Sequence, residues 1–510
     1  AYTTTEDDKH EIQASVDLIH FRITQKVDGK ITQQRTYDTL NGLTESELKN
    51  LYFDALVYVD EDTLSELENE ENLVQTADLQ PAFETAPKTN PYTIDLHPEI
   101  PLDERIDYNF AEKEIETVGK KERFHRNYAA IKVLKDCRSE NRFATSDEQM
   151  ILSRYYGWGG IPEAFDERAD TWRTEYAMLK NILTNDEYAS ARKSTLTAFY
   201  TPQPIISAIY KVMENLGFKQ GNILEPCCAI GNFIGMLPES MKDSKVYGIE
   251  IDNISADIAQ QLYQSSSVMN APFEKAELPD SFFDAVVGNV PFGDYSLADK
   301  RYDKYHFLIH DYFFAKSLDK LRPGGVMCLV TSKGTMDKES TEVRRYIAQR
   351  AELLGAIRLP DNTFKSNAGT EVTSDILILQ KRDRIIDTEP NWIFLDEDEN
   401  GIRMNKYFVD HPDMVLGEMV MQSGRFKPES ACKAYEDRTL EEQLEVAVQN
   451  IKGEISEYTL EDTQESEETY IPADPNVRNF SYTVVDGQIY FRENSVMCEV
   501  QTSETAKNRI

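Results

Sequence analysis

The sequence predicts a doubly wound α/β domain over residues 196–385, and three observations carry this prediction. Short apolar runs recur there, each ending at a turn or a polar residue: NILEPC, KVYGIEI, FFDAVVGN, GGVMCLVTS and ELLGAIRL. Helical stretches such as PIISAIYKVMENLG and DYFFAKSLDKLRPGG lie between several of these runs. The region is also nearly neutral, whereas its flanks are acidic. Strands that alternate with helices favour a mostly parallel sheet covered on both faces.

The charge of the chain is strongly uneven. Its 510 residues carry a net charge of −35, from 55 basic and 90 acidic side chains. Residues 191–385 hold 23 basic and 24 acidic side chains, so almost all of the negative charge belongs to the flanks. This balance excludes a histone-like or basic-tailed DNA binder, but it leaves the middle of the chain able to face a polyanion.

Targeting and metal-binding signals are weak. No apolar run reaches the roughly 18 residues of a membrane span, and the polar start AYTTTEDDKHEIQ lacks a signal-peptide core. None of the six cysteines forms a CxxC pair, which predicts neither zinc nor a disulfide framework and favours a reducing, cytoplasmic setting. His306 and His310 are expected at i, i+4 on a helix, but without a third ligand we expect no metal. Because the chain does not begin with Met, we expect a processed chain or a fragment.

The N-terminal part is expected to form a small α+β module over residues 1–75. VDLIHFRITQKVDGKITQQRTY predicts two strands around the turn Asp28-Gly29. LTESELKNLYFDALVYV predicts a helix with Thr44 as its N-cap and Glu47 completing a capping box. Several prolines then indicate a linker over residues 76–110.

Residues 111–195 are expected to be helical and locally basic. Eight Lys and Arg side chains between Lys120 and Arg142 outnumber three acidic ones. They could contact phosphates or form an ordinary solvated helix face, and the second alternative is at least as well supported. RYYGWGGIPEAF, from Arg154 to Phe165, sets three glycines among four aromatic residues and predicts a tight, packed loop.

The C-terminal region, residues 386–510, is acidic again. LEEQLEVAVQNIKGEI predicts a helix, and EYTLEDTQESEETYIPADP predicts a disordered linker. NFSYTVVDGQIYFREN predicts a hairpin around the turn Asp486-Gly487.

Two acidic motifs follow the first two strands of the expected sheet. In ILEPCCAIGNFIG a strand runs into Glu225-Pro226 and a tight loop that ends at Gly231, which would let the backbone approach a ligand closely. An ordinary strand-to-helix turn is the alternative. The next strand ends in Glu250, which is placed either to accept hydrogen bonds from two ribose hydroxyls or to cap a helix.

The most specific local signal is FFDAVVGNVPFG. An apolar strand ends there in Asn289-Val290-Pro291-Phe292. Asn offers a carbonyl acceptor, Pro stiffens the turn and Phe offers a ring face. An exocyclic amine on a planar base needs acceptors for its hydrogens and a surface on which to stack, and this tetrapeptide could supply both.

Over about residues 195–385 these motifs resemble those of the S-adenosylmethionine-dependent N6-adenine DNA methyltransferases with the gamma-type motif order. TAFYTP, from Thr197 to Pro202, resembles the segment that closes over the methionine part of the cofactor. EPCCAIGNF resembles the acidic-Pro-x-x-Gly-x-Gly-x-Phe cofactor motif, and NVPF resembles the Asn-Pro-Pro-aromatic catalytic motif. LRPGGVMCLVTS resembles the fifth strand and SNAGTEVTSDILILQKR the last β-hairpin.

This resemblance implies a Rossmann-like methyltransferase core, with a mostly parallel seven-stranded sheet and a terminal β-hairpin. It implies S-adenosylmethionine as cofactor, double-stranded DNA as partner, and transfer of a methyl group to the N6 amino group of adenine. The implied catalytic residues are Asn289, Val290, Pro291 and Phe292. The implied cofactor-binding residues are Thr197, Tyr200, Pro202, Glu225, Pro226, Cys227, Gly231, Phe233, Glu250, Ile251 and Phe273.

Two further residues are candidates for substrate contacts. Phe364, in RLPDNTFKSNAG, could be a second ring near a base rotated out of the duplex, or it could pack in an ordinary loop. Lys333, in TSKGTMD, could contact a phosphate or be a solvated loop residue.

A narrower resemblance concerns RYYGWGGIPEAF, NVPFG and LRPGG followed by TSKGTMD. These segments look like those of the large methylase–helicase proteins of phages, plasmids and conjugative elements. The chain lacks the ATP-binding Gly-Lys-Thr loop of the helicase, so we expect an N-terminal fragment whose partner is a helicase domain outside it.

Two positions depart from the family pattern. Ala229 replaces the first glycine of the cofactor motif, and its methyl group could crowd the cofactor. Val290 replaces the first proline of the catalytic motif but keeps the backbone carbonyl. The alternatives are therefore a non-catalytic, DNA-binding scaffold of an antirestriction or DNA-transfer protein, and a methyltransferase acting on RNA adenine or protein glutamine.

Overall fold

In the computed structural model the chain forms two compact units, Ala1–Ala86 and Pro87–Ile510. The structure describes residues 2–5, 10–16, 20–27, 30–38, 96–97, 99–110, 118–195, 200–364, 371–423, 428–455, 470–472, 477, 481–485, 488–493 and 496–499.

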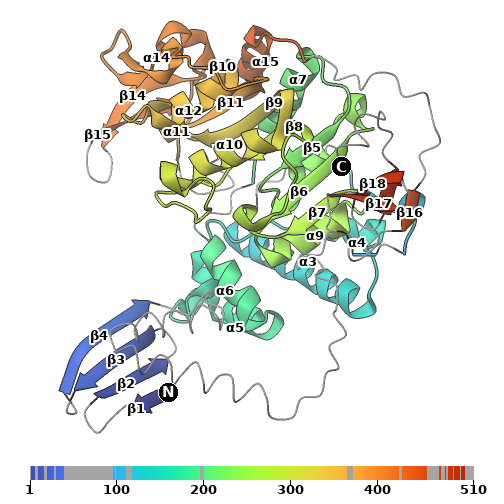
Figure 1. The fold of residues 1–510 in the computed structure, drawn as a ribbon, viewed down its shortest axis with the longest axis vertical. Coiled ribbons are helices and arrows are strands. Elements are labelled where there is room, and N and C mark those ends of the chain that lie inside the picture. Colours follow the sequence, from blue (N-terminus) through green and yellow to red (C-terminus); the bar gives the residue numbers. More distant parts are fainter. Residues whose placement is uncertain are drawn as a thin grey trace. The chain divides into compact units, whose positions relative to one another are not determined.

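The N-terminal unit contains a four-stranded antiparallel sheet in the order β1-β2-β3-β4 (Figure 1). Its strands are β1 (Tyr2–Thr5), β2 (His10–Val16), β3 (His20–Val27) and β4 (Lys30–Asp38). The two strands expected around Asp28-Gly29 are confirmed as β3 and β4, which pair with Val27 opposite Lys30. The helix expected from Thr44 lies outside the described residues.

The second unit is built around a seven-stranded sheet in the order β10-β11-β9-β8-β5-β6-β7. Its strands are β5 (Asn222–Glu225), β6 (Lys245–Glu250), β7 (Ser267–Asn270), β8 (Phe283–Asn289), β9 (Leu321–Ser332), β10 (Ala351–Leu359) and β11 (Ser374–Lys381). Strands β5 to β9 are parallel, whereas β11 runs antiparallel to both β9 and β10. The expected doubly wound sheet with a terminal β-hairpin is confirmed.

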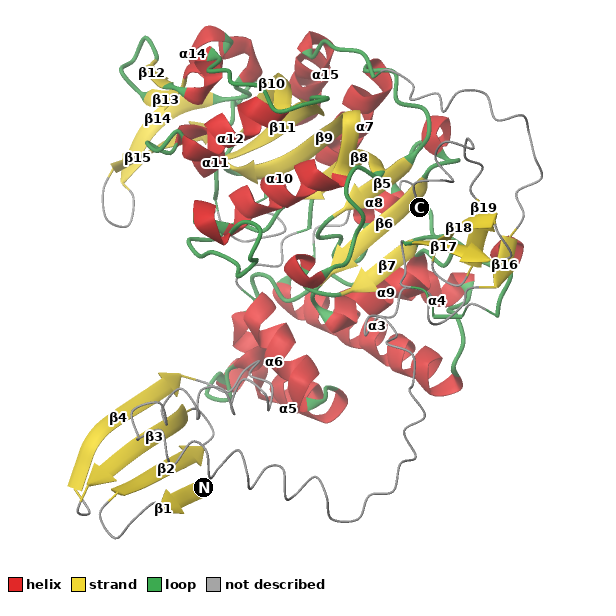
Figure 2. Cartoon of the chain, in the orientation of Figure 1, coloured by secondary structure: helices red, strands yellow, loops and turns green. Residues whose placement is uncertain are grey.

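Helices flank this sheet (Figure 2). They are α7 (Gln203–Asn215), α8 (Asn232–Gly235), α9 (Asn253–Leu262), α10 (Ile309–Lys320), α11 (Gly334–Asp337) and α12 (Glu342–Arg350). The chain moves from β5 to β6 and β7 on one side, and from β8 to β9 and β10 on the other. Right-handed crossovers therefore place α9 on the face opposite α10 and α12.

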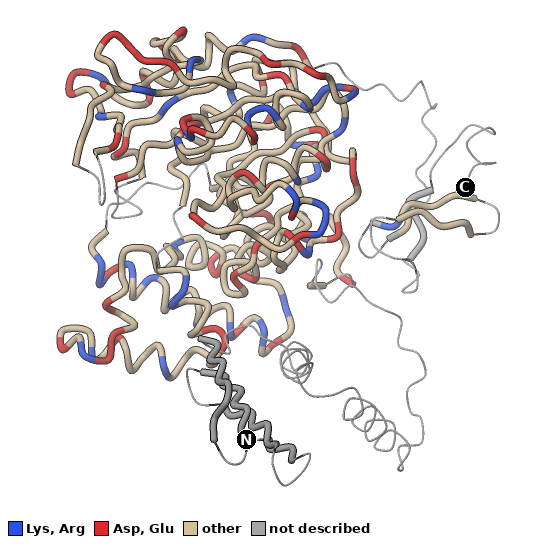
Figure 3. Tube along the Cα trace, turned by 60° about the vertical axis from the view of Figure 1, so that its left-hand side comes forward, with Lys and Arg blue, Asp and Glu red and all other residues tan. Residues whose placement is uncertain are grey.

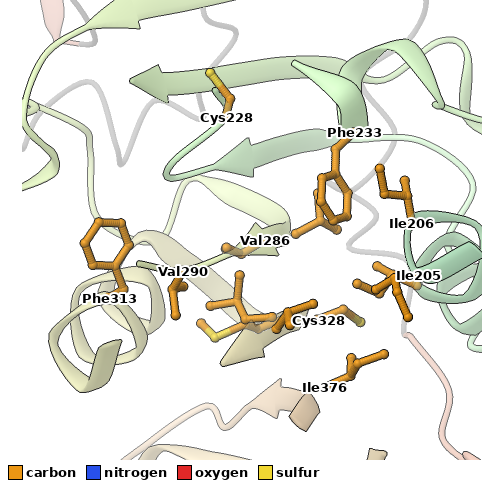
Figure 4. Close-up of a cluster of buried hydrophobic side chains, with 14 of the residues drawn as sticks. Ile205, Ile206, Cys228, Phe233, Val286, Val290, Phe313, Cys328 and Ile376 are labelled. Atoms are coloured by element: carbon orange, nitrogen blue, oxygen red, sulfur yellow. The ribbon is translucent and has the colours of Figure 1, made fainter. Parts of the chain in front are cut away.

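The core of this unit lies between the sheet and its helices. Ile205 and Ile206 of α7 are buried next to Phe233, and Val286 and Cys328 lie on neighbouring strands (Figure 4). Strands covered on both faces are expected to be continuously apolar, and β8 and β9 carry such runs. One apolar core therefore fixes the spacing of the strands and of the loops that leave them.

A helical module precedes the sheet. Its helices are α3 (Lys120–Glu140), α4 (Ser146–Leu152), α5 (Arg173–Ile182) and α6 (Asn185–Ser194). Thr145 and Thr184 begin α4 and α6 with capping boxes. Helices α3, α4 and α6 pack against α9 of the sheet domain, so the module and the sheet form one packed body.

The basic residues of α3 are largely neutralised within this module. Figure 3 shows Lys and Arg positions interleaved with Asp and Glu positions along its helices. The ion pairs include Lys120–Glu163 at 2.5 Å, Lys121–Glu175 at 2.6 Å, Lys135–Glu187 and Arg138–Glu187 at 2.9 Å, and Arg142–Glu148 at 2.7 Å. Of the two interpretations of this segment, the pairing favours a structural helix face over a phosphate-contacting surface.

The C-terminal part follows β11 with small antiparallel elements and a helix. These are β12 (Leu395–Glu397), β13 (Arg403–Asn405), α14 (Lys406–Asp410), β14 (Glu418–Ser423), β15 (Pro428–Lys433), α15 (Leu440–Asn450), β16 (Tyr470–Pro472), β17 (Tyr482–Val485), β18 (Gln488–Glu493) and β19 (Val496–Glu499). The expected helix is present as α15, and the expected hairpin is present as β17 and β18, paired with Val485 opposite Gln488. Most of the expected acidic linker lies outside the described residues.

Short 3₁₀ helices complete the second unit: η1 (Leu102–Glu104), η3 (Pro162–Phe165), η4 (Asp170–Trp172), η5 (Glu239–Met241), η6 (Phe273–Lys275), η7 (Asp303–Tyr305), η8 (Asn391–Ile393) and η9 (Pro412–Met414). The expectation that His306 and His310 share a helix is wrong. His306 ends η7 with a left-handed backbone, and α10 begins only at Ile309. None of the helices within the described segments has the length and apolarity to cross a membrane.

A buried ion cluster ties β10 and β11 to α11. Arg358 is fully buried; its guanidinium donates to both carboxylate oxygens of Asp375, at 2.8 and 2.9 Å, and to Asp337 at 2.9 Å. Its guanidinium carbon also lies 4.2 Å from the ring centroid of Phe408. Removing the cation would leave two carboxylates with little compensation in the interior.

We therefore expect Arg358→Met to lower the free energy of unfolding by about 3–5 kcal/mol, because the buried carboxylates lose their partner. Arg345→Met is the matched control, since Arg345 pairs with Glu389 at the surface, where such pairs contribute only about 0–1 kcal/mol. Chemical denaturation of both variants measures the difference. Equal losses would show that the cluster contributes no more than a surface pair.

Candidate active site

The reversal of strand order between β5 and β8 places the ends of three parallel strands at one edge of the sheet. β5 pairs with β6 on one side and with β8 on the other. The loops after Glu225, Glu250 and Asn289 therefore leave the sheet together. In open α/β sheets, ligands bind in the crevice at such a point.

The loop after β5 is folded back by two left-handed residues. Ala229 has a φ of 50° and Gly231 a φ of 82°. A Cβ at Gly231 would lie 2.5 Å from Cε2 of Tyr263, so both the backbone angle and the neighbouring ring require glycine there. The Gly231 amide donates to the Cys228 carbonyl at 2.7 Å and closes the turn.

The carboxylate of Glu250 holds the tip of this loop. Its oxygens accept from the amides of Ala229 at 2.8 Å and Asp252 at 2.7 Å. Burial raises the pKa of Glu250 to about 7, although these amide bonds oppose the shift. Each carboxylate oxygen keeps further acceptor capacity, so a pair of hydroxyls could bind beside the loop.

Glu225 contributes a second buried carboxylate to this edge. Its side chain is buried, and burial together with the nearby Glu250 raises its pKa. Its Oε2 accepts no hydrogen bond from any residue that the structure describes. A buried acceptor without a donor is costly, so this oxygen is suited to a ligand donor or to a proton.

The Asn289-Val290-Pro291-Phe292 motif after β8 is joined to the loop after β5 by a direct contact. The thiol of Cys227 donates to the Asn289 carbonyl at 2.9 Å. The side-chain Oδ1 of Asn289 is buried and has no donor among the described residues. This amide oxygen is therefore available to accept from a ligand N–H group.

Val290 continues the ladder of β8. Its amide donates to the Val330 carbonyl at 3.0 Å, a bond that a proline at this position could not make. Val290 is buried, whereas Pro291 and Phe292 are half-buried, with Phe292 packed against the core. The backbone hydrogen bond of Val290 thus restrains the loop, whereas a proline would restrain it through its ring.

Other residues implied by the resemblance surround this edge or support it. Pro202 begins α7, Phe233 is buried against Tyr210, and the side chain of Ile251 is 67% exposed. Phe273 is buried on the ring of Phe313 at 4.8 Å. Thr197 lies outside the described residues.

Tyr200 lies beside the loops after β5 and β6. Burial raises the pKa of its phenol, a hydrogen bond with Ser255 opposes this shift, and the charges of Asp252 and Glu250 add to it. The structure therefore brings Tyr200, from the segment before α7, to the strand that ends in Glu250.

The two candidate substrate residues have different surroundings. Phe364 is buried in the loop after β10. Lys333 follows β9, and its ammonium group donates to the backbone carbonyl of Ser430, and to its hydroxyl at 3.1 Å. Lys333 is thus engaged with β15 rather than solvated, and its role toward a phosphate stays a prediction.

Sequence reasoning missed two residues that shape the site. Asp252 begins α9, and it also accepts from the Ser190 hydroxyl at 2.7 Å. Tyr263, at the end of α9, fills the space under Gly231. Asp after a strand is a helix-capping signal that could have identified Asp252, whereas no local signal points to Tyr263.

These groups fit the cofactor that the resemblance implies. The buried carboxylate of Glu225 and the half-buried carboxylate of Glu250 flank a loop with two left-handed residues, and the exposed side chain of Ile251 follows Glu250. This combination suits the hydroxyls and the planar base of a nucleoside. No cluster of three metal-ligating side chains occurs within the described part of the chain.

The strand order and the loops at its switch point define a Rossmann-like methyltransferase fold. Residues 182–413 match the family model described as N-6 DNA Methylase. The resemblance to N6-adenine DNA methyltransferases that the motifs indicated is thereby confirmed.

Similar proteins include "Defense against restriction protein B" of Escherichia phage P1, which is 34% identical over 243 residues, covering 46% of this chain and 9% of the phage protein. Another is "Type II methyltransferase M.CvrRI" of Paramecium bursaria Chlorella virus XZ-6E, 31% identical over 114 residues, covering 22% of this chain and 29% of that protein. The chain therefore spans less than a third of either relative.

Among solved structures, the methyltransferase subunit of a type I restriction-modification system from Streptococcus thermophilus is 13% identical. It has a TM-score of 0.31, with 61% of this chain and 88% of that chain covered.

The left-handed Ala229 yields a test of the loop geometry. We expect Ala229→Gly to raise the free energy of unfolding by about 1 kcal/mol, because the left-handed region costs alanine roughly 1–2 kcal/mol and the added chain entropy offsets part of this gain. Ala177→Gly, on the exposed face of α5, is the matched control and should lower it by about 1 kcal/mol. Urea denaturation would compare them; a loss of stability in both variants would contradict the strained loop.

Proposed function

We propose that this chain transfers a methyl group from S-adenosylmethionine to the N6 amino group of adenine in DNA. The match of residues 182–413 to the N-6 DNA methylase family supports this reaction. The observation that carries the proposal is the buried, unpartnered Oδ1 of Asn289, joined through Cys227 to the loop that faces Glu250.

The cofactor side of the reaction rests on the loop after β5 and on Glu250. S-adenosylmethionine, when bound, supplies an electrophilic methyl group. Glu250 would accept hydrogen bonds from the ribose hydroxyls, and Ile251 would pack against the adenine of the cofactor. The amides of Ala229 and Asp252 hold the Glu250 carboxylate in place, so its orientation is set before binding.

The substrate side rests on the motif after β8. The target adenine leaves the base stack, which costs a few kcal/mol, and stacks on Phe292. Asn289 Oδ1 and the Val290 carbonyl accept hydrogen bonds from its amino group and aim the nitrogen lone pair. Catalysis is then mainly positioning, and it needs no nucleophilic side chain.

Asn289→Ala tests this assignment. We expect methyl transfer to DNA to fall by about 10²–10³-fold, because one of the two acceptors for the amino group is lost. S-adenosylmethionine binding should be unchanged. Transfer of a labelled methyl group to adenine-rich duplex DNA and calorimetric titration measure the two effects separately.

The matched control for this experiment is Asn450→Ala, which removes a surface amide that bonds Asp413. It should leave both quantities unchanged. If Asn289→Ala transferred the methyl group at the wild-type rate, the proposed role of this motif in the reaction would be wrong.

The raised pKa of Glu250 predicts a pH dependence of cofactor binding. Above about pH 7 the group is a carboxylate and accepts from both ribose hydroxyls; below it the proton occupies one acceptor site. We expect the association constant for S-adenosylmethionine to fall by up to about tenfold per pH unit below 7. In Glu250→Gln this side chain no longer titrates. The variant's association constant for S-adenosylmethionine should therefore be lower than that of the wild type and should change less between pH 6 and 8. Parallel curves for the two proteins would contradict the role of Glu250.

A second candidate function is favoured by Ala229, which has the strained angle and a methyl group in the loop. In that case the chain binds DNA as a scaffold without catalysis. The name of the phage P1 relative, which refers to defense against restriction, and its much greater length support a role within a larger protein. A helicase domain is the partner that we propose for this chain. Cofactor binding without transfer to DNA, RNA or a glutamine peptide would favour the scaffold.

A further inference from the structure

The loop Tyr155–Trp158 of the helical module reaches the residues beside the cofactor loop. Tyr155 is buried, and burial raises the pKa of its phenol; the charge of Asp252 adds to this shift, and a hydrogen bond with Ser255 opposes it. Burial also raises the pKa of the Tyr200 phenol, with Ser255 and Asp252 acting in the same directions. Two phenols from different parts of the chain therefore share the neighbourhood of Ser255 and Asp252.

Gly157 makes the closest approach to Tyr200. Its φ is +67°, and a Cβ there would lie 3.0 Å from the phenol oxygen of Tyr200 and 3.2 Å from its Cε2. The ring of Tyr200 thus packs directly on the backbone of the module. A side chain at position 157 would have to displace this ring.

The side chain of Asn127 in α3 holds the Tyr155–Trp158 loop through two hydrogen bonds. It is fully buried; its Nδ2 donates to the Gly157 carbonyl at 2.6 Å, and its Oδ1 accepts from the Tyr156 amide at 2.7 Å. The nitrogen and the oxygen of this side-chain amide thus bind the backbone of two consecutive residues. The position of Gly157, and with it the wall against which Tyr200 packs, is therefore set by a side chain of α3.

A second link joins the module to the same place. The Ser190 hydroxyl of α6 donates to Asp252 at 2.7 Å, and the Asp252 amide donates to the Glu250 carboxylate at 2.7 Å. Asp252 also accepts from the amide and hydroxyl of Ser255, at 2.9 and 2.8 Å. Helix α3 is thus linked to Tyr200 through Gly157, and α6 is linked to Glu250 through Asp252.

We propose that Gly157 and Asn127 are positioning residues for cofactor binding, because they hold Tyr200 against the site formed by Glu250 and the loop after β5. The helical module is then a wall of the cofactor site rather than a separate appendage. This inference rests on the proposed function, since it requires that S-adenosylmethionine bind there.

The test compares two substitutions of left-handed glycines. Gly157→Ala adds a methyl group against Tyr200. Gly401→Ala, at a φ of +74° with nothing within 4 Å, adds the same strain in open space. Calorimetric titration of the full chain with S-adenosylmethionine should show at least about tenfold weaker binding for Gly157→Ala, and wild-type binding for Gly401→Ala. Thermal melts should show that both variants are folded at the temperature of the titration.

A double-mutant cycle identifies the contact. Tyr200→Ala removes the ring, so Gly157→Ala should weaken binding no further in that background. A purely structural role of Gly157 would instead give the same loss with and without Tyr200, and this result would overturn the inference.

The wild-type chain provides a measurement that does not depend on folding of the variants. Saturating S-adenosylhomocysteine should slow amide hydrogen exchange at Tyr155–Trp158, because the ligand immobilises Tyr200 and the loop behind it. Unchanged exchange there, with slowed exchange at Ala229 and Gly231, would overturn the inference and leave the proposed function intact. Absence of binding to the wild-type chain would overturn both.

Discussion

The reversal of strand order at β5 is the constraint on which the rest of the molecule depends. Because β6 lies on one side of β5 and β8 on the other, two motifs some 60 residues apart emerge at the same edge. In open α/β sheets, ligands bind at the point where the strand order reverses in this way. A sheet wound in one direction only would separate Glu250 from Asn289.

Short bonds between the loops turn this proximity into a defined site. Cys227 binds the Asn289 carbonyl, the Cys228 amide binds the Ile249 carbonyl, and the Ala229 amide binds Glu250. Three consecutive residues of one loop thus contact the ends of both neighbouring strands. The departures from the family pattern fit within this frame: Ala229 accepts a left-handed angle, and Val290 adds a bond to β9.

The sheet and the edge that holds the motifs could be predicted because both are local in sequence. Apolar runs that end at Glu225, Glu250 and Asn289 mark buried parallel strands, and parallel strands share their carboxyl edge. The partners of half-buried lysines could not be predicted in this way. Lys333 bonds Ser430, which lies 97 positions away in the sequence, and Lys135 bonds Glu187, which lies 52 positions away. Such pairings depend on how whole elements pack, which periodicity does not encode.

The measurement that tests the central claim most directly is a calorimetric titration of the chain with S-adenosylmethionine, with Glu250→Ala as the control. The proposed function predicts saturable binding at one site per chain, weakened in the variant, because Glu250 holds the loop and would bind the ribose. If Glu250→Ala bound S-adenosylmethionine as tightly as the wild type, the cofactor site would not lie at this edge of the sheet. No saturable binding to the wild-type chain would contradict its assignment as a methyltransferase.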